Sequence, residues 1–366
     1  MFKNKERNLI VLVIGLLVFG LVMVYSSSWP YAVNLGLDPE YFLKNQARAA
    51  IIGLVLMGIF SFVPYRLYKK LALPLYLGAY VLCLLLFTPL GDTYGTFARR
   101  WLNLGPISFM PSDLLKFAAI VALAAYLSSR KKKLKFSQDF IPVMAFIAIS
   151  ILPVYLQPNL STVILMVMVL FAMYFLYGMD LKYFLFIIPM AITAGLIFLT
   201  GEKNAYRRER LRSMFNPLED YHGTGWQLSQ ALFAVSSGGF FGLGLGRSRQ
   251  KHLYLSEAHN DFIFAIIAEE LGLFACIILI ICFLTLLIIG FSIAGSTRDD
   301  FARLLASGIT LLISFQAVIN MAVAVGISPP TGLVLPFISY GGTSLIINLA
   351  MIGILVNIGK TTRRPR

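Results

Sequence analysis

One short stretch of the sequence brings basic and proton-accepting side chains close together. It contains Arg247, Arg249, Lys251, Glu257, His259 and Asp261. A carboxylate or an imidazole can act as a general base or acid, and arginine and lysine can bind a phosphorylated group. Asp261 also directly precedes a long apolar run, where a helix dipole favours a carboxylate as a simple cap. The spacing leaves both interpretations open, with Glu269 as a supporting group on the face of Asp261.

Further cations lie earlier in the same polar segment. Arg210 and Arg212 belong to the stretch 201–261, which is rich in basic residues. The planar fork of arginine donors suits a phosphate or pyrophosphate group. Attraction to anionic lipid headgroups explains the same charges without any substrate. Composition alone favours neither interpretation.

Two polar pairs occur inside otherwise apolar runs. Asp113 and Lys116 are three residues apart, so on a helix they share one face and can neutralise each other. Ionisable groups at membrane depth are functional candidates by default, although a lone pair of this kind is more often structural. Gln316 and Asn320, four residues apart, can hydrogen-bond across neighbouring helices.

The segment 332–344 combines glycines with hydroxyl groups. Its candidate binding residues are Ser339, Gly341 and Gly342. Such a composition permits a broken helix whose backbone donors face a cavity. It equally permits close helix packing through small residues, and both interpretations carry similar weight.

The elements that position these residues follow from the composition. The 366 residues are 58% hydrophobic and 13% charged, whereas a soluble domain carries about a quarter charged residues. The net charge of +14 does not indicate nucleic-acid binding, because basic residues such as Arg130 directly follow apolar runs, as at a cytoplasmic helix end. The three cysteines lie within apolar segments, so no disulfide framework is indicated. Lipid is therefore the expected surrounding of this chain.

A bilayer core of about 30 Å requires about 20 apolar residues in a helix. Ten runs meet or approach this length: residues 9–25, 49–63, 71–90, 114–127, 140–156, 160–177, 183–200, 262–294, 304–327 and 338–358. The first run has no small-residue cleavage site, so we interpret it as a retained helix. We predict an all-α polytopic membrane protein of about ten transmembrane helices, forming a single membrane domain over residues 1–366.

The orientation follows from lysine and arginine residues in short loops, which concentrate on the cytoplasmic side. With the N-terminus inside, the loops around Arg66, Arg130 and Arg298 are cytoplasmic, and ten spans return the C-terminus to that side. The long loop 201–261, between the seventh and eighth helices, is then extracellular. We find no internal repeat and no Walker A motif, so energy must come from the substrate or an ion gradient.

Motifs spread in order along nearly the whole chain resemble the SEDS family of bacterial cell-wall polymerases (shape, elongation, division and sporulation proteins). They are ARRWL at 98–102, PSDLLK at 111–116, QPNL at 157–160, GLGLGRSRQK at 242–251, YLSEAHNDFIFA at 254–265 and PFISYGG at 336–342. The RSRQK and EAH stretches resemble the division and sporulation branch (FtsW and SpoVE) more than the elongation branch (RodA).

The resemblance implies a peptidoglycan glycosyltransferase that polymerises lipid II, a disaccharide peptide carried on undecaprenyl pyrophosphate, at the outer face of the membrane. It also implies a class B penicillin-binding protein, a transpeptidase, as partner. Asp261 matches the family's catalytic base, and nearby cations should keep it ionised. The supporting positions are Trp101, Asp113, Lys116, Glu257, His259 and Glu269.

The pyrophosphate of the substrate requires positive charge or backbone donors. The candidates are Arg210, Arg212, Arg247, Arg249, Lys251, Ser339, Gly341 and Gly342. A divalent cation, Mg²⁺ or Mn²⁺, near Glu257 is left open by the sequence. The departures from the family pattern are Met110 for Gln, Asp113 for Glu, Ser256 for Pro and Asn260 for Thr. The shorter Asp113 side chain leaves its pairing with Lys116 in question.

Two other classes of function remain as alternatives. A lipid II flippase would need polar residues along a complete crossing path, whereas these ionisable groups gather toward the outer face. A non-catalytic scaffold for the division machinery would not explain an acidic cluster beside a basic one. Both alternatives are therefore weaker than the polymerase.

Overall fold

The computed structural model describes residues 4–92, 99–103, 108–130, 140–179, 183, 214, 225–252, 254–255 and 257–363. Within these residues, seven helices are long and apolar enough to cross a membrane: α1 (Lys5–Asn34), α2 (Tyr41–Phe60), α5 (Pro111–Ser128), α7 (Leu160–Gly178), α11 (Ile263–Ser296), α12 (Asp300–Ala324) and α13 (Gly342–Arg363). Shorter apolar helices are α4 (Ala72–Leu84), continued by the 3₁₀ turn η1 (Leu85–Phe87), and α6 (Ile141–Leu156). The predicted all-α polytopic membrane fold is confirmed.

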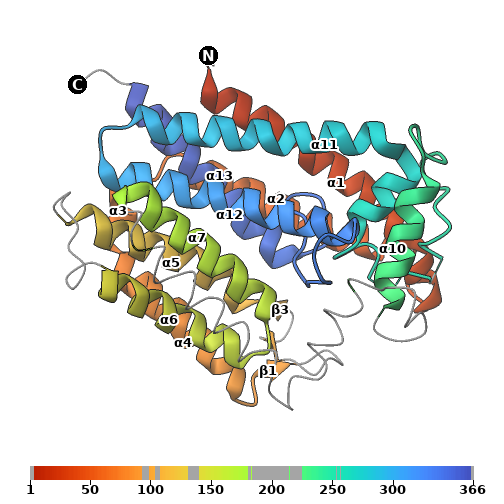
Figure 1. Cartoon of the computed structure of the whole chain (residues 1–366), viewed down its shortest axis with the longest axis horizontal. Coiled ribbons are helices and arrows are strands. Elements are labelled where there is room, and N and C mark those ends of the chain that lie inside the picture. Colours follow the sequence, from red (N-terminus) through yellow and green to blue (C-terminus); the bar gives the residue numbers. More distant parts are fainter. Residues whose placement is uncertain are drawn as a thin grey trace.

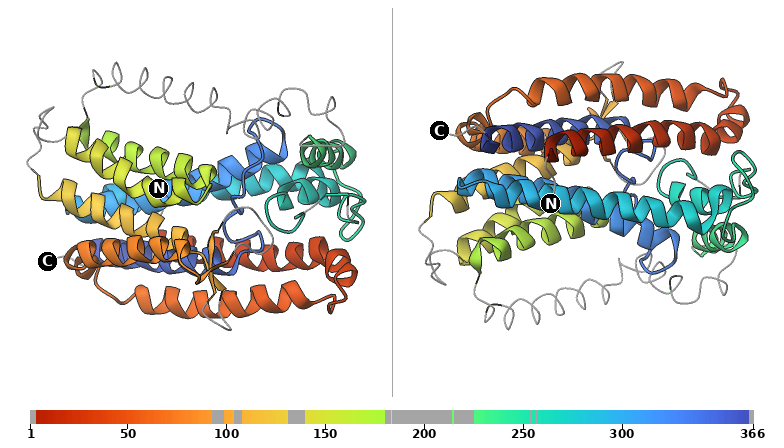
Figure 2. Two further views of the ribbon diagram at one scale, coloured as in Figure 1. Left: turned by 90° about the horizontal axis from the view of Figure 1, so that it is seen from below. Right: turned by 90° about the horizontal axis from the view of Figure 1, so that it is seen from above.

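The helices run side by side in one bundle (Figures 1 and 2). The sequence-distant helices α2 and α13 pack together, as do α11 with α12 and α4 with α5. A Cβ atom on Gly359 would lie 2.9 Å from Glu6 Oε1, so the start of α1 meets the end of α13. This contact fits the predicted termini on one side, while their cytoplasmic location stays a prediction. The predicted span 183–200 lies outside the described residues, apart from Tyr183.

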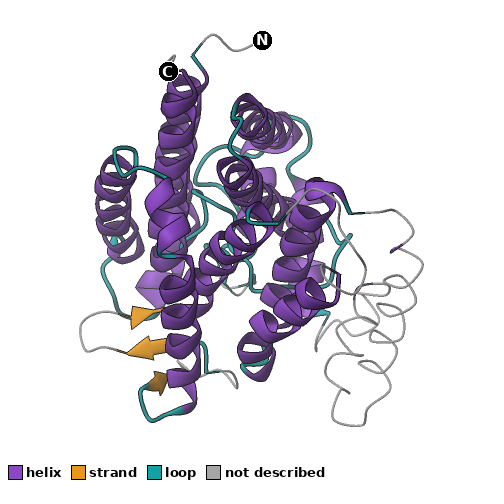
Figure 3. Ribbon diagram, turned by 90° about the vertical axis from the view of Figure 1, so that its left-hand side faces the viewer, coloured by secondary structure: helices purple, strands orange, loops and turns teal. Residues whose placement is uncertain are grey.

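Three features of the fold depart from the expected arrangement. A small antiparallel sheet of strands β1 (Gly91–Asp92), β2 (Trp101–Asn103) and β3 (Ser108–Phe109), in the order β1-β2-β3, lies beside the helices (Figure 3). Strands this short show no alternation that sequence analysis could detect. The helix α10 (Trp226–Ser237) lies within the predicted loop 201–261, and a short helix α3 (Arg66–Lys70) precedes α4.

The segment between α12 and α13 is buried without being helical. The last helix begins at Gly342 rather than near 338, and residues 329–335 form no helix or strand. Backbone carbonyls in such a segment need partners inside the protein. Gln316 donates to the carbonyl of Val334 at 2.9 Å, and Asn320 donates to that of Leu333 at 2.7 Å. Of the two interpretations left open for this segment, the structure has the broken helix, and both amides bond carbonyls of non-helical residues rather than of a neighbouring helix.

Helix α11 is itself interrupted near its N-terminal end. Gly272 has a φ of +76°, a conformation that L-residues with a side chain rarely adopt. The break exposes backbone groups that residues 239–244 satisfy, since Leu243 N–H donates to the carbonyl of Glu269 at 2.9 Å and Leu273 N–H donates to that of Gly239 at 2.9 Å. A Cβ atom on Gly242 would lie 2.2 Å from the Glu270 carbonyl oxygen. The loop after α10 is thereby joined to α11 through the backbone.

Candidate functional site

Asp261 lies just before α11, at the end of the bundle opposite the start of α1. Lys5 hydrogen-bonds the carbonyl of Ser292 near the other end of α11, which fixes this polarity. The side chain of Asn320 holds the Asp261 carbonyl at 2.9 Å. Asp261 is therefore attached to α12 as well as to its own helix.

An arginine lies close to the Asp261 carboxylate. A Cβ atom on Gly332 would be 3.8 Å from Asp261 Oδ2 and 3.4 Å from Arg100 Nη1, so the two charged atoms are at most 7.2 Å apart, the sum of these distances. Arg100 also donates to the carbonyl of Pro158 at 2.9 Å. Three segments distant in sequence, at positions 100, 261 and 332, thus converge on one polar cluster. A Cβ atom at position 332 would be in van der Waals contact with both charged groups.

His259 is packed among aromatic rings. Its ring centroid lies 4.4 Å from Phe42, 5.4 Å from Tyr31 and 5.6 Å from Tyr340. Burial lowers the pKa of His259 to about 4, because this apolar setting penalises the charged imidazolium. The His259 carbonyl also accepts a hydrogen bond from the Tyr340 N–H at 2.9 Å. His259, predicted as a supporting group, is a neutral side chain that packs the 257–261 turn against α1, α2 and the 332–341 segment.

Glu257 lies at the exposed edge of the same turn. Its φ of +56° is unusual for a residue with a side chain, and its carboxylate accepts a hydrogen bond from the Asn260 side chain. Desolvation raises the pKa of Glu257, and the Asn260 bond opposes this shift. In the described part of the chain, no three His, Cys, Asp or Glu side chains converge as a metal site would require. No reaction step is therefore assigned to a divalent cation near Glu257.

Asp113 and Lys116 form a buried ion pair on α5. Lys116 Nζ lies 2.7 Å from Asp113 Oδ1, and both residues are buried. The predicted mutual neutralisation is confirmed, and the shorter aspartate still reaches its partner. Lys116 also donates to Gln316 Oε1 at 3.3 Å. Because Gln316 and Asn320 hold adjacent carbonyls of the 329–335 segment, the ion pair is connected to Asp261 through α12.

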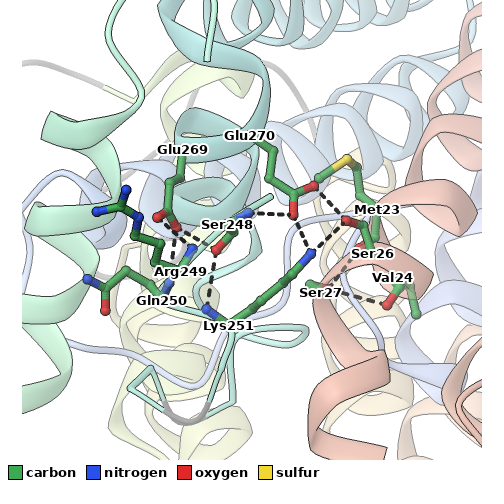
Figure 4. A network of polar contacts seen from close by, with 10 residues as sticks. All are labelled: Met23, Val24, Ser26, Ser27, Ser248, Arg249, Gln250, Lys251, Glu269 and Glu270. Carbon is green, nitrogen blue, oxygen red and sulfur yellow. Dashed lines mark hydrogen bonds and ion pairs between the residues drawn. The ribbon is translucent and has the colours of Figure 1, made fainter. Parts of the chain in front are cut away.

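Lys251 and Glu269 both have partners inside the protein. Lys251 Nζ pairs with Glu270 Oε1 at 2.7 Å, and both side chains are fully inaccessible (Figure 4). The Lys251 ammonium group therefore has an internal partner, and its role in binding pyrophosphate stays a prediction. Glu269 accepts hydrogen bonds from Ser248 Oγ at 2.5 Å and from the Arg249 N–H at 2.9 Å. It holds the 248–250 loop rather than supporting Asp261 directly.

The polar groups of the 339–342 turn also have partners inside the protein. Ser339 Oγ accepts from the Leu335 N–H at 2.8 Å, and the Gly341 N–H donates to Gln46 Oε1 at 3.1 Å. Gly342 is the first residue of α13, where a Cβ atom would lie 3.6 Å from that of Ala49. The expected exposed donors at Ser339 and Gly341 are instead used to hold the broken helix in place.

The remaining predicted residues fall into three groups. Arg247 and Arg249 are exposed on the loop after α10, so their guanidinium groups are accessible. Trp101 is half-buried on β2, next to Arg100. Arg210 and Arg212 lie outside the described residues.

Sequence analysis missed two contributors to these clusters. Arg100 belongs to the ARRWL motif, but only the tertiary contact with Gly332 places it beside Asp261. Glu270 neighbours Glu269, and the sequence offers no sign of which carboxylate pairs with Lys251. Proximity in the fold supplies that information.

The fold and this cluster define a polytopic membrane protein with an acidic and basic site at one end of its helix bundle. The family model described as cell cycle protein, which covers FtsW, RodA and SpoVE, matches residues 7–364. The chain belongs to this family, the SEDS proteins, and is a multi-pass protein of the bacterial cell membrane.

Curated relatives align over nearly the full chain. A probable peptidoglycan glycosyltransferase FtsW from Geobacter sp. (strain M18) is 39% identical, and the alignment covers 99% of each chain. Stage V sporulation protein E from Bacillus subtilis (strain 168) is 36% identical, with 98% of each chain covered. Both belong to the branch that the RSRQK and EAH stretches predicted.

Solved structures show the same fold. A structure described as structural coordination of polymerization and crosslinking by a peptidoglycan synthase complex matches with a TM-score of 0.79, 27% identity and 98% coverage of both chains. Thermus thermophilus rod shape determining protein RodA matches with a TM-score of 0.71 and 27% identity, covering 98% of this chain and 97% of that one. The fold is therefore RodA-like.

Proposed function

We propose that this chain, a peptidoglycan glycosyltransferase of the SEDS family, joins lipid II units into β-1,4-linked glycan strands at the outer face of the membrane. The synthesis is of the division or sporulation type, as in its FtsW and SpoVE relatives. The observation that carries the proposal is the convergence of Asp261 and Arg100 on Gly332, at the bundle end opposite the chain termini.

In the proposed reaction, Asp261 removes the proton from the 4-hydroxyl of the acceptor sugar. The acceptor oxygen then forms a bond to the anomeric carbon of the donor while the bond from that carbon to the pyrophosphate oxygen breaks. Undecaprenyl pyrophosphate leaves with the bonding electron pair, and the α-linked donor becomes a β-linked product by inversion. No nucleotide is required, because the leaving group is already activated.

The leaving group develops negative charge that nearby cations can stabilise. Arg100 is one such cation, because it lies with Asp261 beside Gly332. Arg247 and Arg249 are exposed and available to the pyrophosphate, and we retain Arg210 and Arg212 as further candidates. Lys251 is left out of this role in the proposal, because it is enclosed with Glu270.

The proposed partner is a class B penicillin-binding protein that crosslinks the new strands. Support comes from the structural relative that belongs to a peptidoglycan synthase complex for polymerization and crosslinking. The transpeptidase would act on the product as it leaves the outer face.

The test is polymerisation of labelled lipid II by the purified protein, alone and with its cognate penicillin-binding protein. We expect Asp261→Asn to lower the rate by about 10²–10⁴-fold, the usual contribution of a general base. Asp38→Asn is the matched control, because Asp38 lies between α1 and α2 with its side chain 80% exposed.

Each outcome separates the alternatives. Glycan strands from the wild type and from Asp38→Asn, but not from folded Asp261→Asn, would support both the activity and the base. Equal rates for all three proteins would keep the polymerase and remove Asp261 as its base. Failure of the complex to polymerise, together with movement of lipid II across liposomes, would replace the polymerase by a flippase.

A further inference from the structure

A buried polar network connects residues 248–251 with α1 and α11 (Figure 4). At its centre, Lys251 Nζ contacts Glu270 Oε1 at 2.7 Å and lies 3.5 Å from Ser26 Oγ. Ser26, on α1, donates to the other oxygen of Glu270 at 2.6 Å. The network thus joins three elements: α1, the loop after α10, and α11.

The same loop is held to α11 by a second carboxylate. Glu269 accepts hydrogen bonds from Ser248 Oγ and from the N–H groups of Arg249 and Gln250, at 2.5, 2.9 and 3.4 Å. Glu270 accepts from the Ser248 N–H at 3.3 Å. Two adjacent carboxylates therefore hold the backbone N–H groups of positions 248–250 and the side chains of Ser248 and Lys251.

These contacts close a ring in the chain. Lys251 is bound to Glu270 of α11. Asp261 lies only two residues before α11 begins at Ile263. Lys251 and Asp261, at the two ends of this stretch of chain, are therefore both attached to α11. Trp29 of α1 stacks edge-on against His252 at 5.5 Å, which holds the first residue after the pair.

We propose that Lys251 and Glu270, together with Ser26, form a positioning pair that sets the place of Asp261 relative to the substrate. This inference rests on the proposed function, since it assigns these residues an effect on Asp261 rather than a contact with lipid II. The pair acts through the 252–260 loop, which carries displacement at Lys251 to Asp261. The proposal also explains the serine at position 26, which is the α1 contact of the pair.

The principal rival is the role first suggested by the sequence, in which Lys251 binds pyrophosphate. The two roles predict different kinetics. A positioning pair lowers kcat because a displacement of about 1 Å at the reacting groups costs about 10²-fold in rate. A pyrophosphate ligand instead weakens lipid II binding when Lys251 is neutralised, and Glu270 contributes nothing of its own.

The test uses the full-length protein in complex with its penicillin-binding protein and measures kcat, KM and lipid II binding. The central variant is the double substitution Lys251→Met with Glu270→Gln, which leaves no buried charge without a partner and so is the variant most able to fold. Lys251→Met and Glu270→Gln alone complete a double-mutant cycle. Ser26→Ala removes the α1 contact and keeps the ion pair, and Lys44→Met, at an exposed position in the first turn of α2, is the matched control.

We expect the folded double variant to lose about 10²-fold in kcat, with KM and lipid II binding changed less than twofold. The single variants that fold should lose no less than the double variant, and Ser26→Ala should lose severalfold. Unchanged kcat in the folded double variant would overturn the proposal. A rise in KM confined to variants of Lys251 would also overturn it in favour of a pyrophosphate ligand.

The proposed function is judged separately in the same assay. If the wild type makes no polymer, the glycosyltransferase proposal fails and the variants carry no weight. If the wild type polymerises lipid II and the double variant matches it, the positioning pair alone fails.

Discussion

The protein contains two buried ion pairs that are assembled in different ways. Asp113 and Lys116 lie three residues apart on one helix, whereas Lys251 and Glu270 join a loop to a helix and recruit Ser26 from α1, 244 residues away from Glu270. The first pair retains side-chain exposures of 8% and 5%, and the second has none. Local geometry is sufficient for the first pair, while the second exists only when three elements have packed.

The comparison teaches how similar charges serve different purposes. In the α5 pair, Lys116 donates a hydrogen bond to Gln316, and Gln316 donates one to the 329–335 segment beside Asp261. The Lys251–Glu270 pair receives contacts from its surroundings and fixes the loop that carries Asp261. The two pairs therefore hold Asp261 from the α12 side and from the loop side.

The largest expected effect is the loss of one partner from a pair. Breaking a buried ion pair leaves an uncompensated charge and costs about 3–5 kcal/mol of stability. We expect Lys251→Met to approach the upper end of this range and Lys116→Met the lower end, because the second pair is completely enclosed. Denaturant unfolding in detergent micelles measures both. Equal losses would show that enclosure does not distinguish the pairs.

The neutral, buried side chain of His259 should make the stability of the protein depend on pH. Above pH 6.5 His259 is uncharged in both the folded and the unfolded chain, so its contribution to stability is complete. Below pH 6.5 the unfolded chain gains a proton that the folded chain accepts only near pH 4, since burial lowers the pKa of His259 to about 4. Stability should therefore fall by about 1.4 kcal/mol per pH unit, or about 3 kcal/mol in all.

The measurement is the free energy of unfolding of the wild type and of His259→Phe between pH 8 and pH 4. The variant should lose this part of the acid slope. His252→Phe, at an exposed position, is the control and should retain it. An identical slope in the wild type and His259→Phe would contradict a neutral, buried His259.

The link from the α5 pair to the site can be broken at α12. Asn320→Leu removes donors to the carbonyls of Asp261 and Leu333, whereas Gln316→Leu removes one to Val334 and a contact with Lys116. An unsatisfied buried carbonyl costs about 1–3 kcal/mol. We expect both variants to lose stability in this range, and Asn320→Leu to lose more polymerase activity. Greater inactivation by Gln316→Leu would show that the contact with Lys116 matters more for activity than the hydrogen bond to the Asp261 carbonyl.

The smallest effect should come from a pair that is not enclosed. Arg303 and Asp300 interact on the surface at the start of α12, with side-chain exposures of 39% and 30%. Exposed pairs contribute about 0–1 kcal/mol. Arg303→Gln should change the unfolding free energy by less than 1 kcal/mol, and a loss comparable to that of Lys116→Met would show that enclosure is not what makes the buried pairs matter.

Much of the architecture follows from local sequence. Apolar runs gave the long helices because an apolar stretch of about 20 residues has few other stable arrangements in a bilayer. The three-residue spacing of Asp113 and Lys116 gave their pairing, since it is a property of one helix. The proline and glycine residues near positions 329 and 341 likewise indicated breaks between helices. The small sheet and α10 were not, because short elements in a polar segment leave no periodic signal.

Within the site, the sequence determined which chemical groups are present: Asp261 before an apolar run, arginines in the outer loop, and hydroxyls and glycines near position 340. Only the tertiary structure decided which of them are open to a ligand. It enclosed Lys251 with Glu270, used Ser339 and Gly341 to satisfy the broken helix, and brought Arg100 to Asp261. The reason is physical: a charge or a backbone donor is a property of its residue, but its burial and its partner depend on elements that meet only after the whole bundle has packed.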